Sequence, residues 1–230
     1  NVTLDYRGFL TNKATIEYHD YMPVISLSTK PYSNIKTEVF KRAFDIGFSV
    51  CALLVCFPIM LLIALAVRLT SAGPVFFTQD RSGRGGVTFK IIKFRSMHVN
   101  MKAVGSQHSQ GKKDPRITPI GNFLRQTRLD ELPQFINVLK GDMSIVGPRP
   151  LARYDVDMLM DNSPEHFKKI LTIKPGITSI GQIKVGYADN LETAVRRMKY
   201  DLLYIKNISL ATDIWLIFQT VKVMVLARGR

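Results

Sequence analysis

The feature that most constrains this chain is an apolar run without a charged residue, from Ile46 to Val67. A helix of about 20 apolar residues is long enough to cross the hydrocarbon of a bilayer. The sequence therefore predicts a membrane helix over roughly residues 44–69. The cysteines of the chain, Cys51 and Cys56, both lie in this run, so we expect small apolar side chains there and neither a disulfide nor a zinc site.

A proline near the centre of the run predicts a bend in this helix. Pro58 lacks an N–H and its ring clashes with the preceding turn, so Phe57 and Pro58 mark the expected kink. Two arrangements stay open, a kinked helix that spans the membrane and a re-entrant helix that returns to the side it entered from. Cytoplasmic flanks carry Lys and Arg, and both flanks here are basic, which favours the re-entrant form. The basic residues are Lys36, Lys41 and Arg42 before the run and Arg68, Arg81 and Arg84 after it.

The charge of the chain points to an anionic partner. Its 230 residues carry a formal net charge of +14, with a pI near 9.9. Nucleic acid, an anionic membrane surface and phosphorylated substrates are all compatible with this excess. A chain of this length can hold one domain with a real core. Residues 1–40 begin without methionine and are mixed, polar and partly strand-like, so we expect a linker or the end of an upstream region there, and the folded domain in residues 41–230.

Beyond the apolar run, the pattern predicts a compact α/β (α+β) body with amphipathic helices. The apolar tail over 211–230 is either a buried helix or an interfacial helix that lies along the membrane. Between run and tail, periodicity and turn residues predict a hairpin over 75–97, a polar loop over 100–116, a helix over 163–172, an extended segment over 174–187 and a charged helix over 190–206.

Two adjacent acids, Asp130 and Glu131, precede an amphipathic stretch in LDELPQFINVLKGD. Apolar residues recur there at the spacing of one helical face. Proline is tolerated only in the first turn of a helix, so Pro133 predicts that both acids lie at the helix N-terminus. One interpretation is that they only cap this helix, which is worth about 1 kcal/mol.

The neighbours of the two acids suggest a chemical role as well. A glycosidase pair is excluded, because its carboxyls flank a sugar at about 5–9 Å, which adjacent residues cannot easily do. Adjacent acids can instead have different roles: one attacks an electrophile while the other binds a divalent cation. Arg125 and Arg128 precede the pair and Arg149 follows it in a proline-braced corner. Arginines around a helix N-terminus suit phosphate, so the stretch predicts a phosphoryl-transfer site.

Several motifs together resemble the bacterial sugar transferase family, the monotopic phosphoglycosyl transferases. They are KRAFDIGFS, PVFFTQDRSG, FKIIKFRSM, DPRITPIGNFLR, LDELPQFINVLKGDMSIVGPRP, KPGIT and YDLLYIKNISLATD. The resemblance covers roughly residues 41–228. It implies an α/β body with a re-entrant membrane helix bent at a proline, which agrees with the charge argument. It also implies a place at the bacterial cytoplasmic (inner) membrane, with the catalytic body on the cytoplasmic face.

The resemblance implies an activity too. Asp130 would attack the β-phosphate of a UDP-sugar and expel UMP, and polyprenyl (undecaprenyl) phosphate would then take the sugar phosphate, starting the assembly of a cell-surface polysaccharide or glycoconjugate. Glu131 would bind Mg²⁺, the expected cofactor. Lys93, Arg125 and Arg149 would contact the diphosphate or the lipid phosphate. The implied partners are thus a UDP-sugar, polyprenyl phosphate and the lipid bilayer, with no nucleic acid, while a homo-oligomer stays open.

The sequence departs from the family at two places. Phe57 stands where Ser is common, and residues 179–187 read SIGQIKVGY where better-known members have Gly-Trp-Ala-Gln-Val-Asn-Gly-Arg. The sugar is therefore not implied.

Two non-catalytic hypotheses remain beside the enzyme. In a membrane-tethered basic protein, Phe94 could stack on nucleic-acid bases between Lys93 and Arg95. In a membrane scaffold the two acids would only cap a helix, and Asp130→Asn would leave all activity intact.

Overall fold

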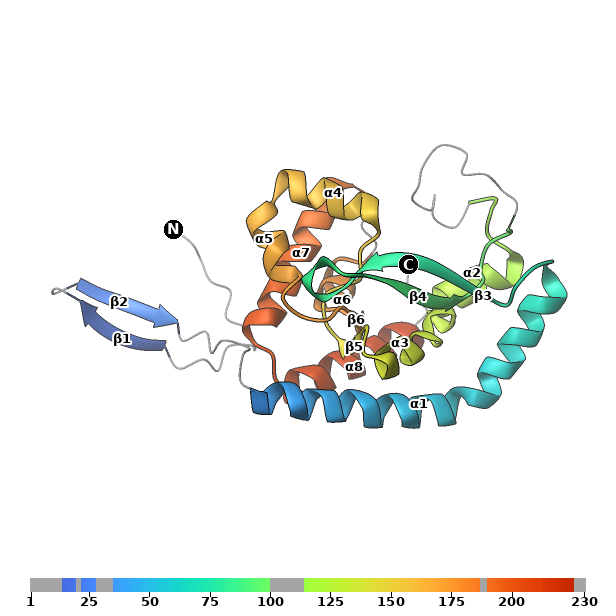
Figure 1. The fold of residues 1–230 in the computed structure, drawn as a ribbon, viewed down its shortest axis with the longest axis horizontal. Coiled ribbons are helices and arrows are strands. Elements are labelled where there is room, and N and C mark those ends of the chain that lie inside the picture. The colour runs from blue at the N-terminus through green and yellow to red at the C-terminus, as the bar shows by residue number, and fades with distance from the viewer. Residues whose placement is uncertain (1–13, 20–21, 28–34, 100–113, 187–189, 226–230) are drawn as a thin grey trace.

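The computed structural model describes residues 14–19, 22–27, 35–99, 114–186 and 190–225. These residues form a mixed helix–sheet fold with small sheets, as predicted (Figure 1). The strands are β1 (Ala14–His19), β2 (Met22–Leu27), β3 (Phe76–Ser82), β4 (Thr88–Phe94), β5 (Ser144–Val146) and β6 (Gly176–Thr178). The helices are α1 (Ile35–Thr70), α2 (Pro119–Thr127), α3 (Gln134–Lys140), α4 (Arg153–Asn162), α5 (Pro164–Ile170), α6 (Ile180–Val185), α7 (Leu191–Lys206) and α8 (Leu210–Val225), with 3-10 turns η1 (Arg84–Gly86) and η3 (Leu129–Glu131).

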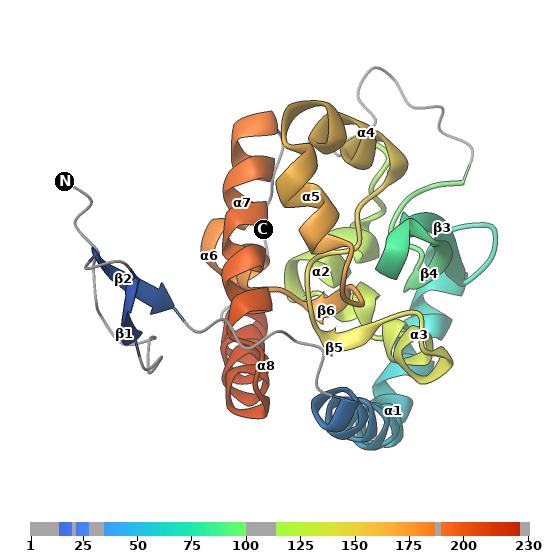
Figure 2. The same ribbon diagram turned by 60° about the vertical axis from the view of Figure 1, so that its left-hand side comes forward.

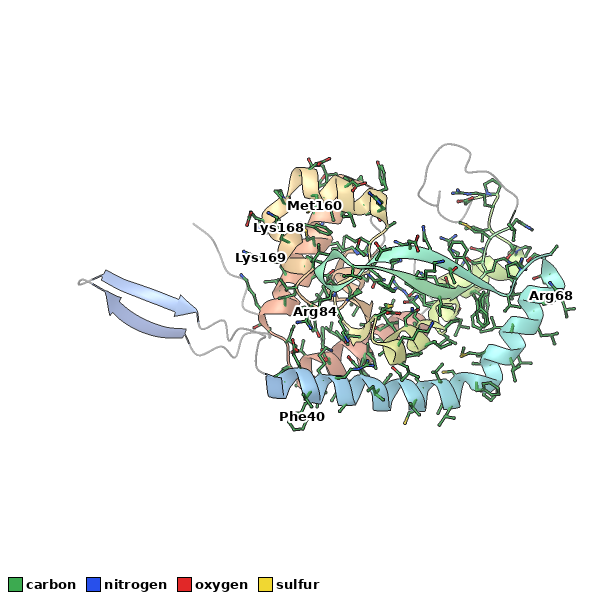
Figure 3. The ribbon with its side chains drawn as sticks, viewed as in Figure 1. Phe40, Arg68, Arg84, Met160, Lys168 and Lys169 are labelled. Carbon is green, nitrogen blue, oxygen red and sulfur yellow. The ribbon has the colours of Figure 1, made fainter. Side chains whose placement is uncertain are left out.

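Helix α1 contains the apolar run and is long and apolar enough to cross a membrane. It begins at Ile35 rather than near residue 44, and Pro58 lies inside it. Figure 1 shows α1 along one side of the body, with its C-terminal end bent towards α2. Figure 3 labels Phe40 and Arg68 towards its two ends, and Phe40 points away from the body. Most large apolar side chains of α1 are exposed, as expected of a helix that faces lipid.

Polar contacts fasten both ends of α1 to the same body. Near its start, the Arg42 guanidinium donates to the carbonyls of Val138 (2.6 Å) and Leu139 (2.9 Å), at the end of α3. Beyond its other end, the buried Arg95 donates to the carbonyls of Ser71 (2.7 Å) and Ala72 (2.5 Å). These arginines bind carbonyl groups that a helix leaves without an intrahelical partner at its C-terminus.

Three apolar clusters form the core of the described residues. The first joins β4, α3, β5, α7 and α8, and comprises Ile91, Val138, Met143, Ile145, Val146, Ile173, Tyr204 and Leu216. The second joins the C-terminal half of α1 to β4 and α2, and comprises Ile63, Val67, Phe94, Leu124 and Leu132. The third lies between α4, α5 and α7, which Figure 2 shows side by side, and comprises Leu159, Phe167, Ile170 and Met198.

The predicted hairpin is confirmed, because β3 pairs with β4 in antiparallel register. Its pairing turns Phe94 inward, where the ring is 1% exposed and stacks on Phe76 with a centroid distance of 5.3 Å. The hypothesis that Phe94 stacks on nucleic-acid bases is therefore wrong.

The prediction that both acids lie at the N-terminus of the amphipathic helix is wrong in detail. Asp130 and Glu131 form the 3-10 turn η3, whereas α3 starts at Gln134 with Pro133 in the capping position. The cause is Arg128, whose left-handed backbone (φ 56°) ends α2 and turns the chain before the acids. No side chain caps α3 or η3, so the interpretation of Asp130 as a helix cap is also wrong.

The extended segment predicted over 174–187 is only partly correct. Residues 176–178 form β6, but α6 follows at once. The helix starts there because the Ser179 hydroxyl accepts a hydrogen bond from the Gln182 N–H (3.1 Å), an N-cap. The helices predicted over 163–172, 190–206 and 211–230 are confirmed as α5, α7 and α8, while most of the predicted polar loop lies outside the described residues.

Candidate active site

A cavity of about 800 Å³ brings four of the predicted site residues together, while Glu131 and Arg128 lie behind its lining. Its lining includes Lys93 of β4, Arg125 of α2, Asp130 of η3 and Arg149 from the corner after β5. These residues are distant in sequence and come from four elements, so their convergence is a product of the fold. Phe57 and Pro58, the predicted kink, lie outside the cavity and are exposed on α1.

Strand β4 is held in place beside the cavity by a buried amide. Asn137 of α3 accepts a hydrogen bond from the Ile92 N–H (3.0 Å) and donates one to the Lys90 carbonyl (2.8 Å). Its side chain thus pairs with the strand backbone as a neighbouring strand would. Lys93 follows directly, so Asn137 fixes the direction from which its ammonium group approaches the acids.

Glu131 is surrounded by cations. Its Oε1 lies 2.8 Å from Lys93 Nζ and 3.7 Å from Arg149, and its Oε2 lies 3.8 Å from Arg128. Burial alone would raise the pKa of Glu131, but Lys93, Arg149 and Arg128 outweigh it and hold the pKa well below its ordinary value. Burial in turn lowers the pKa of Lys93, although Glu131 opposes this. Glu131 is therefore ionised throughout the neutral range.

Asp130 has the opposite environment. It is 8% exposed and lines the cavity, yet its carboxylate makes no hydrogen bond or ion pair with any residue that the structure describes. Burial raises its pKa to about 6, and Lys93 lowers it only in part. A buried ionised carboxylate without a partner among the described residues is poorly stabilised, which suits a nucleophile.

Two glycine motifs fix the corner that carries Arg149. The Gly147 N–H donates to the Thr178 carbonyl (3.0 Å), and the Gly176 N–H donates to the Pro148 carbonyl (2.8 Å). A Cβ on Gly147 would lie 2.5 Å from the Lys174 carbonyl oxygen, too close for any side chain. The GPRP and KPGIT motifs thus hold each other in place, where the chain leaves β5 and where it enters β6.

The side-chain amide of Gln182 holds two of the arginines in place. The Gln182 side-chain oxygen, in the orientation that its neighbours require, accepts hydrogen bonds from Arg128 (2.9 Å) and Arg149. Gln182 and Arg197, which also lines the cavity, were missed in the sequence. A signal for Gln182 existed, since Ser179 and Gln182 have the spacing of a helix start. For Arg197 no local pattern distinguishes it from its neighbour Arg196.

The two acids also bear on metal binding. Among the described residues, no three or more His, Cys, Asp and Glu side chains lie together so that they could hold a metal ion by themselves. Mg²⁺ is commonly held by one or two carboxylates together with substrate phosphates and water, and the pair fits this pattern. Glu131 Oε2 suits a cation best, because its ion pair with Arg128 is long (3.8 Å).

Comparison with known proteins gives consistent similarities. The bacterial sugar transferase family matches residues 36–227. A UDP-N-acetylgalactosamine-undecaprenyl-phosphate N-acetylgalactosaminephosphotransferase of Aeromonas hydrophila is 41% identical over 189 residues, 82% of this chain and 44% of that protein. A UDP-glucose:undecaprenyl-phosphate glucose-1-phosphate transferase of Escherichia coli K12 is 44% identical over 217 residues, 90% of this chain and 44% of that protein. An exopolysaccharide production protein of Rhizobium leguminosarum bv. phaseoli is 42% identical, over 84% of this chain and 98% of that protein. The chain thus spans less than half of the first two relatives and nearly all of the third.

Proposed function

Because the chain belongs to the bacterial sugar transferase family, we propose that it transfers a sugar 1-phosphate from a UDP-sugar to undecaprenyl phosphate. The names of two relatives describe this reaction with different sugars, N-acetylgalactosamine and glucose, so the proposal specifies the donor only as a UDP-sugar. Both substrates are anionic, and the basic cavity is complementary to them. We place the catalytic unit in residues 41–230.

The reaction that we propose has two displacements at one phosphorus atom. An Asp130 carboxylate oxygen attacks the β-phosphorus of the donor, and the bond from that phosphorus to the bridging oxygen breaks, releasing UMP. The resulting aspartyl–phosphosugar is then attacked by an oxygen of undecaprenyl phosphate, and the bond to Asp130 breaks. Undecaprenyl-diphospho-sugar leaves and the carboxylate is restored.

One observation carries this proposal: Asp130 is a buried carboxylate without a hydrogen bond or ion pair among the described residues, and it lines a cavity rich in cations. Glu131, by contrast, is tightly paired with Lys93. The two adjacent acids therefore differ as a nucleophile and an electrostatic partner should differ.

The cations around Asp130 are assigned to the phosphates. Lys93 and Arg125 act on Asp130 and contact the phosphate under attack, while Arg149 and Arg128 act on Glu131 and neutralise the rest of the diphosphate. Glu131 would hold Mg²⁺, which would supply positive charge that screens the diphosphate from the attacking carboxylate.

The attachments of α1 support a re-entrant arrangement. A spanning helix would place its ends on opposite faces of the membrane, but Arg42 and Arg95 tie both ends of α1 to one body. We therefore propose that α1 enters and leaves the inner membrane on the cytoplasmic face, bending at Phe57–Pro58. The exposed apolar residues Leu210, Ile214, Phe218 and Val221 of α8 would rest on the same membrane surface.

The proposed chemistry is tested by incubating the purified protein with UDP-sugars and Mg²⁺ without lipid acceptor. Intact mass should increase by one sugar phosphate, and one equivalent of UMP should appear. Added undecaprenyl phosphate should discharge the adduct. Absence of an adduct with every UDP-sugar, or an adduct that still forms in Asp130→Asn, would overturn the mechanism.

The topology is tested with single cysteines at Thr37 and Thr70 in a chain whose Cys51 and Cys56 are replaced by Ser. A membrane-impermeant maleimide should label neither position in intact spheroplasts and both after permeabilisation. Labelling of one end in intact cells would mean that α1 spans the bilayer.

A further inference from the structure

A second group of cations lines the cavity beyond the residues that surround Asp130. Arg197 of α7 and Arg149 both line it, and Arg149 is the charge that acts most strongly on Arg197. The cations that act most strongly on Asp130 are instead Lys93 and Arg125. The cationic lining of the cavity therefore extends from a first subsite, Lys93 and Arg125, which act on Asp130, to a second subsite, Arg149 and Arg197.

Arg197 is buried without a matching acid. It is 8% exposed, and its guanidinium makes no ion pair or hydrogen bond with the residues described. Asp201 is the acid that acts most strongly on it. The Asp201 Oδ1, however, already accepts hydrogen bonds from the Ser179 hydroxyl (2.7 Å) and the Gly181 N–H (3.0 Å). Glu131 is no alternative, because it is paired with Lys93.

A buried cation of this kind is costly unless something neutralises it. Burial, followed by repulsion from Arg149, lowers the pKa of Arg197 to about 9, so the guanidinium still carries its charge at neutral pH. The missing counter-charge is thus expected from a ligand. A guanidinium recognises phosphate in particular, because it can donate two parallel hydrogen bonds.

The cavity beside Arg197 is apolar and lies on the side of the body away from α1. Its lining there comes from α4, α5 and α7, and includes Leu159, Phe167, Ile170, Leu191, Ala194 and Met198. Figure 2 shows these helices together, and Figure 3 places Met160, Lys168 and Lys169 across the body from Phe40 of α1. With α1 in the membrane as proposed above, this part of the cavity lies away from the lipid, so a water-soluble ligand is its expected occupant.

We propose that Arg197 and Arg149 bind the nucleotide-side phosphate of the donor, which departs as part of UMP, and that the nucleoside occupies the apolar part of the cavity. This inference rests on the proposed function. Lys93 and Arg125 are then left for the phosphate that Asp130 attacks. The two subsites separate the leaving group from the sugar phosphate, so UMP departs on one side while the lipid acceptor approaches from the other.

The test compares equilibrium binding of UMP with that of uridine, which lacks the phosphate. Arg197→Gln should weaken UMP binding by about 10–100-fold, the size expected for a charge-assisted phosphate contact, and leave uridine binding unchanged. Arg197→Lys, which keeps the charge, should recover part of the loss. The matched control is Arg196→Gln, because Arg196 precedes Arg197 on α7 but is exposed; it should bind UMP as the unmodified protein does. Thermal melts of all variants report their folding.

Several outcomes would overturn the inference while leaving the proposed function intact. Equal weakening of UMP and uridine would mean that Arg197 only packs α7 against its neighbours. Unchanged UMP binding with a raised KM for undecaprenyl phosphate would assign the arginine to the acceptor. A protein that neither binds UMP nor forms an adduct with any UDP-sugar would instead overturn the proposed function and this inference together.

Discussion

Two clusters of buried charge are built in opposite ways. The first, the anchor cluster, comprises Lys41, Asp45, Tyr204 and Asp213. Lys41 Nζ lies 2.6 Å from Asp213 and 3.8 Å from Asp45, and the Tyr204 hydroxyl donates to Asp213 (2.7 Å). Asp45 also accepts a hydrogen bond from the Ile145 N–H (3.2 Å). Both carboxylates share Lys41, and each also accepts a hydrogen bond from a neighbouring group, so every charged group has a partner; together they join α1 to β5, α7 and α8.

The second, the catalytic cluster, comprises Lys93, Arg125, Arg128, Asp130, Glu131, Arg149 and Arg197. Here cations outnumber acids, and neither Asp130 nor Arg197 has an ion pair in the described part of the chain. Matched buried charges hold elements together, whereas unmatched ones cost stability until a ligand arrives. The comparison therefore predicts that substitutions in the catalytic cluster mainly change activity and substitutions in the anchor cluster mainly change stability.

The largest effect is expected for Asp130→Asn. An amide cannot attack phosphorus as a carboxylate does, so turnover should fall by at least about 10³-fold, as for other nucleophile replacements. Intact mass should show no phosphosugar adduct, although the variant should fold. Asp213→Asn in the anchor cluster is the control and should still form the adduct. If Asp130→Asn retains activity, Asp130 is not the nucleophile and the two acids have a structural role.

Removal of divalent metal should have the next-largest effect on activity. If Glu131 holds Mg²⁺ beside the diphosphate, excess chelator should abolish turnover because the charge of the donor is no longer screened. Added Mg²⁺ should restore it, and the chelated protein should melt as before, since its own cations already pair Glu131. Full activity in excess chelator would show that Lys93, not a metal, is the working partner of Glu131.

Asp213→Asn should have the largest effect on stability. It leaves Lys41 buried with only the longer contact to Asp45, and breaking a buried pair costs about 3–5 kcal/mol. Urea unfolding in detergent measures this loss. Glu165→Gln is the control, because its pair with Lys168 is exposed (3.8 Å) and should be worth less than about 1 kcal/mol. Equal losses in the two variants would contradict the distinction between matched and exposed charge.

Much of the catalytic cluster could be predicted because its acids and arginines occur in compact, unusual stretches. Asp130, Glu131 and Arg149 lie within one continuous segment, and the family resemblance added Lys93. Their surroundings could not be predicted in detail, because a left-handed Arg128 inserts a separate turn before α3. A single sequence does not indicate that an arginine will adopt this backbone, which costs more than it would for glycine.

The anchor cluster could not be predicted at all. Lys41 and Asp213 are separated by 172 positions, and each has an ordinary appearance in its own helix. Apolar runs and spacing predicted α1, α7 and α8 as helices, and Ser163 and Pro164 predicted the start of α5, because these signals are local in the sequence. They gave no information about which polar residues on different helices would meet, since that depends on packing of the whole body.

The smallest predicted effect concerns the pH dependence of stability. Burial raises the pKa of Asp130 from 3.8 to about 6 in the folded protein. Between these pH values the folded state binds a proton that the unfolded state does not, so stability decreases as pH rises through 6. The shift corresponds to about 3 kcal/mol, at about 1.4 kcal/mol per pKa unit. Asp130→Asn avoids this cost, so at pH 8 it should be more stable than the unmodified protein by up to about 3 kcal/mol, and the gap should narrow below pH 6 and close only near pH 3.8. Urea unfolding at several pH values measures it. A gap independent of pH would mean that the charge of Asp130 is compensated in the folded protein, which would contradict the description of Asp130 as a buried carboxylate without a partner.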